Sequence, residues 1–412
     1  MMEAGTSVSE KLQSSCCIAG GGPAGMMLGY LLARAGIEVL ILEKHADFLR
    51  DFRGDTVHPS TLETMHELGL LDEFLKRPHQ QVRQVRARIG GEKIVLGDNS
   101  YLRTKCRFFV MMPQWEFLDF LAEEGRRYHT FHMRMRAEVT GLIEENGRIS
   151  GIRGNTPAGP LEVRADLVVG ADGRDSVVRD CSGLEVEDIG APTDALWMRL
   201  SKHPDDPQFF VLADHGKLLA MLDRGDYWQC GFPILKGSAD ELRRKSIEVF
   251  RGSIVEVAPF LRDRVAELHD WNDVKLLTVK VNRLRQWYRP GLLCIGDAAH
   301  AMSPIGGVGI NLAIQDAVAA SNILTEPLRK RTVSAGDLAK IQRRRAFPTR
   351  ATQRLQEVIR KQTGRDVGKS GTARPPWPVR LLERTTLLCR LRTRFVSIGV
   401  RPEHVKTLDV YK

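Results

Sequence analysis

The sequence lacks any uninterrupted apolar run of the roughly 20 residues that a membrane-spanning helix requires. Arg, Lys, Asp or Glu breaks every hydrophobic stretch of the 412-residue chain, although 42% of its residues are hydrophobic. Residues 1–13 also lack the charged-then-apolar order of a secretory signal. We therefore expect no membrane span and a cytoplasmic globular protein with enough apolar material for one large or two ordinary domains.

Paired cysteines are also missing. The seven cysteines are scattered and odd in number, and no two have the C-x-x-C spacing that builds a zinc site. We expect reduced, mostly buried thiols and no bound metal. Internal repeats and long low-complexity tracts are absent as well, which argues against a repeat architecture.

Positive charge, in contrast, is in excess, with a formal net charge of +10. Much of the excess lies late in the chain, in residues 329–331, 343–345 and 380–401. Charge alone specifies a partner weakly, so we interpret it as a solvated basic face that attracts anionic small molecules. We expect no nucleic-acid partner.

The chain opens with an α/β unit. The apolar run 16–19 predicts a buried strand, residues 23–34 predict a helix that stops at Gly36, and residues 37–42 predict a second strand. A short crossover helix favours parallel pairing of these two strands.

Other segments interrupt this pattern. Residues 82–96 alternate on both sides of a Gly-Gly turn and predict a hairpin. Residues 184–280 contain short alternating segments separated by Gly, Asp and Pro, which predicts a mixed or antiparallel sheet. Buried strands are predicted again at 163–170 and 292–295, so the first domain resumes twice.

The first strand and helix are joined by Gly20-x-Gly22-x-x-Gly25, in the context that a dinucleotide fingerprint requires. The glycines permit a tight turn and close approach of the backbone to a pyrophosphate, and the helix N-terminus attracts the phosphate charge. Glu43 follows Gly25 by 18 residues, near the offset of roughly 20 expected of a carboxylate that binds the adenosine ribose. The predicted cofactor contacts of this unit are Gly20, Gly22, Pro23, Ala24, Gly25, Glu43 and Lys44.

Two later segments resemble a known family. LVVGADGRDSVVR at 167–179 resembles the Asp-Gly motif, and LLCIGDAAH at 292–300 resembles the Gly-Asp motif, of the para-hydroxybenzoate hydroxylase family of class A flavin-dependent monooxygenases. Their order and separation match as well. The resemblance implies that Asp297 binds ribityl or ribose hydroxyls of FAD, and that Asp172 lies near the pyrophosphate in a segment that also takes part in nicotinamide use.

The resemblance continues through PIGGVGIN at 304–311. It implies that the backbone amides of this loop and the positive end of the following helix stabilise the negative charge of reduced flavin. It also implies that the carbonyl group of Pro304 borders the substrate. The cofactor contacts implied here are Gly307, Val308, Gly309, Ile310 and Asn311.

Three further cofactor contacts are implied by weaker similarity: Arg53, Gln114 and, through its main chain, Val139. A residue that accepts a proton from a phenolic substrate is not marked by any motif. By residue type, His58, His300 and Tyr227 are candidates, although a histidine is more often a structural hydrogen-bonding group than a base.

The fold class implied is α/β, a Rossmann-like FAD-binding domain interrupted by a mixed or antiparallel β-sheet substrate domain, with a helical C-terminal region. The predicted boundaries of these three parts are 14–80, 107–183 and 281–330 for FAD, 81–106 and 184–280 for the substrate, and 331–412 for the C-terminal helices.

The activity implied is hydroxylation of an aromatic molecule that is phenol-, quinoline- or quinone-like. NADPH or NADH would reduce FAD, and a flavin C4a-hydroperoxide formed with O2 would transfer one oxygen atom. No second dinucleotide fingerprint is present, so nicotinamide binding would be transient. The sequence leaves open which nicotinamide is used and whether the protein is a monomer or a homodimer.

Two other functions remain open at this stage. A reductase of the same fold would use FAD without productive consumption of O2. Alternatively, the flavoprotein would be a binding or regulatory module that docks peripherally on a membrane through a basic C-terminal helix, in which Leu381, Leu388, Leu391 and Phe395 recur near helical spacing. A helix that packs its apolar side on the first domain explains the same spacing.

Overall fold

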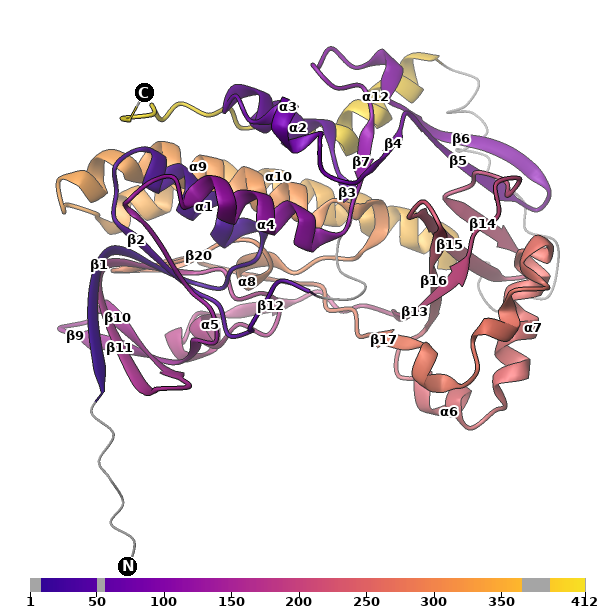
Figure 1. The fold of residues 1–412 in the computed structure, drawn as a ribbon, viewed down its shortest axis with the longest axis horizontal. Helices are drawn as coiled ribbons and strands as arrows, with labels where there is room; N and C mark the ends of the chain where they lie inside the picture. The colour runs from indigo at the N-terminus through magenta and orange to yellow at the C-terminus, as the bar shows by residue number, and fades with distance from the viewer. Residues whose placement is uncertain (1–8, 50–55, 365–385, 412) are drawn as a thin grey trace, which may run out of the picture.

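The computed structural model describes residues 9–49, 56–364 and 386–411. The implied cofactor contact Arg53 lies outside the described residues. Two sheets organise the molecule, with long helices over the first and shorter helices outside the second (Figure 1). Within the described ranges, no helix is long and apolar enough to cross a membrane.

The first sheet has eight strands. Their bounds are β1 Glu10–Ala19, β2 Val39–Leu42, β8 Phe131–Arg134, β9 Glu138–Glu145, β10 Arg148–Thr156, β11 Gly159–Gly170, β19 Tyr288–Arg289 and β20 Leu292–Cys294. The order is β19-β20-β11-β1-β2-β8, and β10 and β9 extend the sheet antiparallel from β11. The strands β20, β11, β1, β2 and β8 run parallel, as the sequence predicts for an α/β unit.

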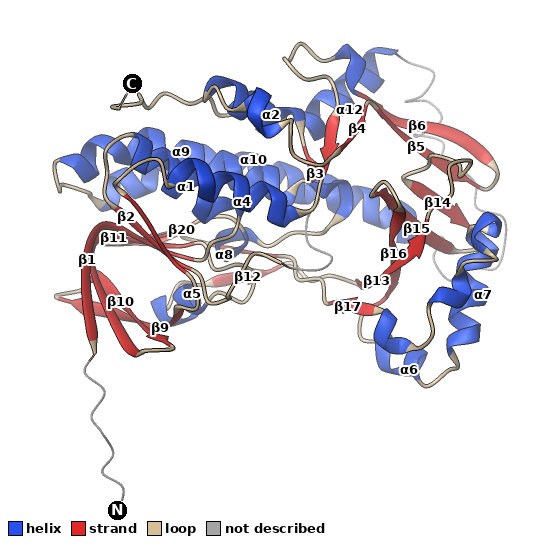
Figure 2. Cartoon of the chain, viewed as in Figure 1, coloured by secondary structure: helices blue, strands red, loops and turns tan. Residues whose placement is uncertain are grey.

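A layer of four helices covers one face of this sheet (Figure 2). They are α1 Pro23–Arg34, α4 Gln114–Gly125, α9 Gly309–Arg329 and α10 Ala335–Gly364. Helix α1 is buried along most of its length because it contacts both α4 and α9. Its predicted bounds are confirmed, and Gly36 follows its end with a φ of 77° that suits glycine.

The parallel strands end together at one edge of the sheet. Ala19 of β1 pairs with Gly170 of β11 and with Leu42 of β2, and Gly170 also pairs with Cys294 of β20. The chain therefore leaves four neighbouring strands at the same level. This register places the glycine loop, Glu43 and the Asp-Gly and Gly-Asp segments side by side, where open α/β sheets bind their ligands.

The second sheet has seven strands: β5 Gln84–Ile89, β6 Glu92–Asp98, β13 Thr193–Ser201, β14 Val211–Asp214, β15 Lys217–Asp223, β16 Tyr227–Leu235 and β17 Lys275–Leu277. Their order is β17-β13-β16-β15-β14-β5-β6, with only β14 and β5 parallel. The predicted hairpin is confirmed, since Gly90 and Gly91 form its turn with positive φ angles of 56° and 84°. The mixed fold class is likewise confirmed.

Alternation along its strands gives the second sheet two different faces. Leu196 and Met198 of β13, with Trp228 and Cys230 of β16, pack in one core with Phe250. Phe250 belongs to α7 Ile247–Val257, which follows α6 Ala239–Arg243 on the outer side of the sheet (Figure 1). The intervening residues of each strand point to the opposite face, toward the first sheet and its helices.

Shorter elements connect the two sheets. The strands are β3 Thr56–Val57, β4 Gln80–Val82, β7 Phe109–Met111, β12 Val186–Asp188 and β18 Asn282–Leu284, and the helices are α2 Pro59–Glu67, α3 Leu71–Phe74, α5 Val177–Ser182, α8 Asp297–His300 and α12 Thr386–Ser397. Five single 3-10 turns complete the described elements: η1 Asn99–Tyr101, η2 Pro259–Leu261, η3 Val265–Glu267, η4 Trp271–Asp273 and η5 Ile305–Gly307.

The predicted helical C-terminal region is confirmed by α10 and α12, but the last described residues are not helical. Beyond α12 the described chain has no further helix and runs back over the first domain. The Val410 amide donates to Arg34 (3.1 Å), Arg34 donates to the Thr407 carbonyl (2.8 Å), and the Tyr128 hydroxyl donates to Asp409 (3.0 Å). These hydrogen bonds hold the non-helical tail on the first domain. A search for helical periodicity in the sequence does not predict them.

The helix α12 is integrated into the fold. Its Thr393 hydroxyl accepts from the Asp98 amide (3.2 Å), and its Ser397 hydroxyl donates to the Asn99 side chain (2.7 Å), both at the end of the β5–β6 hairpin. Leu391 nevertheless remains exposed. The helix thus has both an anchored side and an exposed apolar residue.

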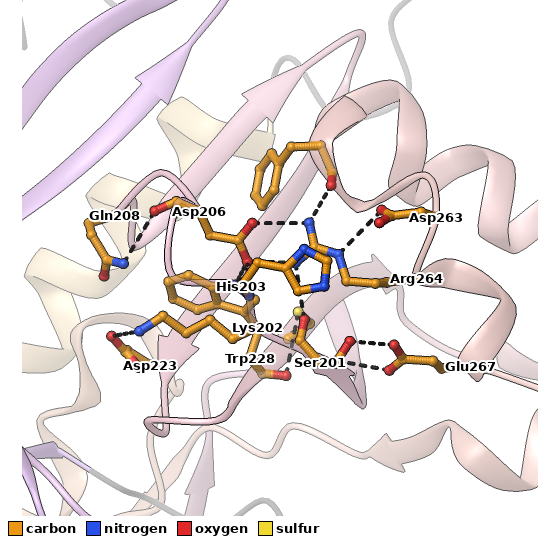
Figure 3. Close-up of polar contacts among 12 residues, drawn as sticks. Ser201, Lys202, His203, Asp206, Gln208, Asp223, Trp228, Asp263, Arg264 and Glu267 are labelled. Carbon is orange, nitrogen blue, oxygen red and sulfur yellow. Dashed lines mark hydrogen bonds and ion pairs between the residues drawn. The ribbon is translucent and has the colours of Figure 1, made fainter.

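A buried ion pair connects the loop after β13 with the segment after α7 and with β16 (Figure 3). Asp206 accepts from two nitrogens of Arg264 (2.6 and 3.0 Å), from the indole of Trp228 (2.7 Å) and from the His203 amide (3.0 Å). Burial alone would raise the pKa of Asp206, but these hydrogen bonds hold it below its ordinary value.

Removing one partner of this pair should be strongly destabilising. In Arg264→Met, the Asp206 carboxylate stays buried without its cation, so we expect a loss of about 3–5 kcal/mol of unfolding free energy. Restoring neutrality in Arg264→Met/Asp206→Asn should recover part of the loss. Lys76→Met, which breaks the exposed Lys76–Glu73 pair, is the control and should change little. Urea unfolding measures all three, and equal stability of Arg264→Met and Lys76→Met would contradict this account.

Candidate functional site

Two positions in the glycine loop after β1 require glycine for steric reasons. Gly20 has a φ of 102°, and a Cβ atom there would lie 2.5 Å from the Ala171 carbonyl oxygen. A Cβ atom at Gly25 would lie 2.0 Å from the Gly20 carbonyl oxygen. Only glycine allows the loop to fit between α1 and the Asp-Gly segment.

Gly22 has a different role, because a Cβ atom there would meet no protein atom within 4 Å. It is the N-cap of α1 and is followed by Pro23, and no side chain caps this helix end. The first amides of α1, including those of Ala24 and Gly25, therefore face a space that suits an anion. An open cradle at an uncapped helix N-terminus fits the pyrophosphate of FAD.

Glu43 lies directly beside this loop. Its Oε2 accepts from the Gly21 amide (2.9 Å), and its Oε1 contacts the His45 amide (3.0 Å) and Nδ1 (2.5 Å). The Glu43 carbonyl accepts from the Ala137 amide (2.9 Å), which brings the chain near Val139 to the same corner. Lys44 is exposed. The carboxylate thus orders the glycine loop at the position where a ribose contact is predicted.

The Asp-Gly segment is folded by Asp172. Its carboxylate accepts from the Ser176 hydroxyl (2.5 Å) and the Val178 amide (3.1 Å), and burial raises its pKa. Arg174, two residues on, places a guanidinium nitrogen 3.9 Å from Asp297. The Asp-Gly and Gly-Asp segments are therefore adjacent, and the carboxylate of Asp297 remains about one-third exposed at the start of α8.

A buried polar triad fixes α8 against the helical layer. Asp316 accepts from the Gly296 amide (3.2 Å) and from Arg345 (2.9 Å), and its Oδ2 lies 2.6 Å from Nε2 of His300. Burial would raise the pKa of Asp316, but His300 and Arg345 keep it lowered. His300, a candidate base by residue type, is thus a structural partner that is 1% exposed.

The sequence analysis missed Asp316 and Arg345. A signal was present, because Asp316 lies among Ile314 and Ala317 on the apolar face of its helix. A carboxylate on a buried face requires a partner. Which arginine supplies the partner depends on the packing of α10 against α9, and the sequence pattern does not specify it.

The loop 304–311 is anchored through Asn311. The Asn311 Oδ1 accepts from the His58 amide and the Thr61 hydroxyl (both 2.8 Å), while its Nδ2 donates to the carbonyls of Thr56 and Gly307 (both 3.2 Å). All four contacts are within the protein, so the Asn311 side chain shapes the loop. The sequence did not indicate Thr56 or Thr61 as its partners.

The same loop presents its backbone beside β3. Gly307 has a φ of 61°, and a Cβ atom there would lie 2.9 Å from Thr56 Oγ1. Val308 and Ile310 are buried, whereas Pro304 is exposed. Gly309 begins α9, and no side chain caps that helix end. The loop therefore offers amides and a helix N-terminus, as the resemblance implies for the flavin ring.

The structure does not bring the three remaining candidate residues, His58, Tyr227 and Gln114, into contact with one another. His58 is fully buried, with Nδ1 3.0 Å from the Val396 carbonyl and its ring 4.6 Å from that of Phe109. Tyr227 lies on the second sheet, on the face opposite α7, with the Arg199 guanidinium 3.8 Å from its ring centre. Gln114 begins α4 and is half-buried. Among the described residues, no hydrogen bond or ring contact joins Tyr227 to His58.

Comparison with known proteins identifies the class of protein that this fold and site define. A family model described as an FAD binding domain matches residues 13–355. Because this match spans most of the chain, the chain belongs to that FAD-binding family, and it is an FAD-dependent monooxygenase.

Individual relatives agree with this assignment. The chain is 34% identical to 6-methylpretetramide 4-monooxygenase from Streptomyces rimosus, over 90% of this chain and 88% of that protein. It is 24% identical to para-nitrophenol 4-monooxygenase from Pseudomonas sp. (strain WBC-3), over 73% and 75%. Several other curated relatives are longer, and the chain covers between 56% and 64% of their length.

A solved structure shows the same fold. The crystal structure of p-nitrophenol 4-monooxygenase PnpA from Pseudomonas putida superposes with a TM-score of 0.76 at 19% identity, covering 95% of this chain and 99% of that one. The predicted fold, family, FAD cofactor and oxidoreductase activity are thus confirmed. The individual site residues stay predictions.

The two glycines provide a direct test of the phosphate cradle. Gly22→Ala should fold normally, because its Cβ has open space, but it should weaken FAD binding at least about tenfold, or ~1.4 kcal/mol. Gly25→Ala should fail to give folded protein, because its Cβ overlaps the Gly20 carbonyl. Gly252→Ala, which is equally open on α7, is the control for both. Flavin titration and circular dichroism measure the outcomes; unchanged FAD affinity in Gly22→Ala would refute the cradle.

The buried His58 should make stability depend on pH. Burial lowers its pKa from 6.5 to about 4, so the unfolded chain binds a proton that the folded chain excludes between these values. Neutral His58 therefore contributes up to about 3 kcal/mol to the free energy of unfolding. This contribution is complete above pH 6.5 and is lost as the pH falls toward 4. His58→Gln should flatten this part of a plot of unfolding free energy against pH. An unchanged slope would show that His58 is protonated in the folded state.

Proposed function

We propose that this chain hydroxylates a fused-ring phenolic molecule with consumption of NAD(P)H and O2. The observation that carries the proposal is its 34% identity, over nine-tenths of its length, to a monooxygenase named for 6-methylpretetramide. The site supports it, because the first domain offers a flavin cradle and the second sheet turns a broad face toward it.

FAD would be held by groups from three neighbouring loops. The pyrophosphate would lie at Gly22 and the N-terminus of α1, with the adenosine toward Glu43 and the ribityl chain toward Asp297. The ring would then lie at the amides of 307–309. When bound and reduced by NAD(P)H, FAD would activate O2, one atom of which goes to the substrate and the other to water.

The protein's own residues would position the reaction and exclude water. Asn311 holds the 304–311 loop at β3 through four hydrogen bonds, which fixes its amides before the cofactor arrives. We assign the substrate to residues 81–106 and 184–280, on the face opposite α7. The carbonyl of Pro304 would border it from the flavin side.

His58 and Tyr227 receive different roles in this proposal. His58 is buried and neutral at pH 7, so it would support the loop rather than accept a proton from substrate. Tyr227 is on the proposed substrate face and has the Arg199 cation beside its ring. Tyr227 is therefore the candidate for contact with the substrate hydroxyl group.

Turnover of two phenols tests the proposal. The FAD-loaded protein is mixed with NADPH or NADH in ¹⁸O2 and either 6-methylpretetramide or para-nitrophenol, and products are analysed by mass spectrometry. We expect one ¹⁸O atom in the fused-ring product, formed in step with nicotinamide oxidation. Substrate reduction without O2 uptake would instead identify the reductase, and flavin that neither nicotinamide reduces would overturn the proposal.

A further inference from the structure

A partly enclosed cavity of about 60 Å³ lies between α9, α10 and the end of α12 (Figure 1). Its wall includes Gly306 and Val308 of the 304–311 loop, so we call it the loop cavity. Leu312 of α9 and Leu355 of α10 line it as well. The loop cavity is therefore in direct contact with the segment whose amides are proposed to hold the flavin ring.

Apolar atoms make most of the wall of the loop cavity, because its main polar side chains are bonded to the protein. Asn311 makes the four hydrogen bonds described above, Arg345 donates to Asp316, and Gln356 Nε2 donates to two backbone carbonyls beside the loop (both 2.8 Å). Two amide atoms, Gln315 Nε2 and Gln356 Oε1, have no hydrogen-bond partner among the described residues, but protein atoms enclose each of them completely. A water molecule needs two to four polar partners, so this cavity suits an apolar molecule better than water.

The size of the loop cavity limits what it can hold. A volume of roughly 10–15 Å³ suffices for one water molecule, whereas an apolar cavity of about 150 Å³ takes up benzene. At about 60 Å³, the loop cavity is too small for an aromatic ring unless its walls move, but it has room for a diatomic gas molecule. O2 is a small apolar molecule that a monooxygenase consumes.

We propose that the loop cavity is an O2-binding site that supplies O2 to reduced flavin. This inference rests on the proposed function for the position of the flavin ring. Transfer of an apolar molecule from water into an apolar cavity is favourable, so O2 concentrates there. The 304–311 loop separates the cavity from the proposed position of the ring, and Gly306, which has no side chain, makes this wall thin. O2 in the cavity then has only the loop to pass.

Xenon tests the binding site without turnover, because it is apolar, smaller than benzene and visible in a crystal structure. Crystals of the FAD-loaded protein are pressurised with xenon, and we expect a xenon peak between Leu312 and Leu355. Leu312→Phe should abolish the peak, because the larger side chain fills the cavity, and Leu312→Ala should strengthen it. Leu391→Phe makes the same change at an exposed position of α12 outside the cavity and should leave the peak unchanged.

Reoxidation of the flavin tests the supply of O2. The FAD-loaded protein is reduced with dithionite and mixed with O2 without aromatic substrate, so that two electrons pass from reduced FAD to O2 and hydrogen peroxide is released. In Leu312→Phe, we expect the second-order rate constant for O2 to fall at least about threefold, because the filled space is closed to the gas, with FAD affinity unchanged. Leu355→Phe fills the cavity from α10 and should act in the same way, so the test does not depend on one variant. Leu391→Phe should react like the wild type.

The two measurements separate failure of this inference from failure of the proposed function. Loss of the xenon peak together with slower reoxidation in Leu312→Phe supports the O2 site even if no hydroxylated product forms, in which case only the proposed hydroxylation fails. An empty wild-type cavity under xenon, or reoxidation of Leu312→Phe and Leu355→Phe at the wild-type rate, would overturn the O2 site even if product forms. Reduced wild-type flavin that does not react with O2 would overturn both.

Discussion

The common end of four parallel strands is the constraint on which the rest of this structure depends. Ala19, Leu42, Gly170 and Cys294 are in register, so the loops that follow them meet at one edge of the first sheet. The loops after Ala19, Gly170 and Cys294 are short and lead into helices. A shift of one residue in any strand would move its loop away from the others and turn its side chains to the wrong face.

Buried polar groups then hold this edge in one shape. Asp316 connects the turn before α8 to α9 and α10, and Asn311 connects the start of α9 to β3 and α2. Such groups are costly to bury unless every partner is present, so they favour a single arrangement of loop and helix. The proposed FAD site is thereby ordered by contacts that lie behind it, which suits a protein that holds its cofactor in a fixed position.

Much of this was accessible from the sequence. Helix α1 was predicted with its observed bounds, and the Gly-Gly hairpin and the return to the first domain were predicted from local periodicity and turn residues, which act over a few residues. β1 begins at Glu10 rather than at Cys16, because only its buried half is a continuous apolar run. The partners of Asp316 and Asn311 and the tail beyond α12 depend on contacts between distant segments, and no local pattern encodes them.

The structure of the protein with FAD bound is the measurement that tests the central claim most directly. The account predicts the pyrophosphate at Gly22 and the N-terminus of α1, the ribityl chain beside Asp297, and the flavin ring between the 307–309 amides and the inner face of the second sheet. A pyrophosphate bound away from α1, or a ring that turns away from the second sheet, would contradict it.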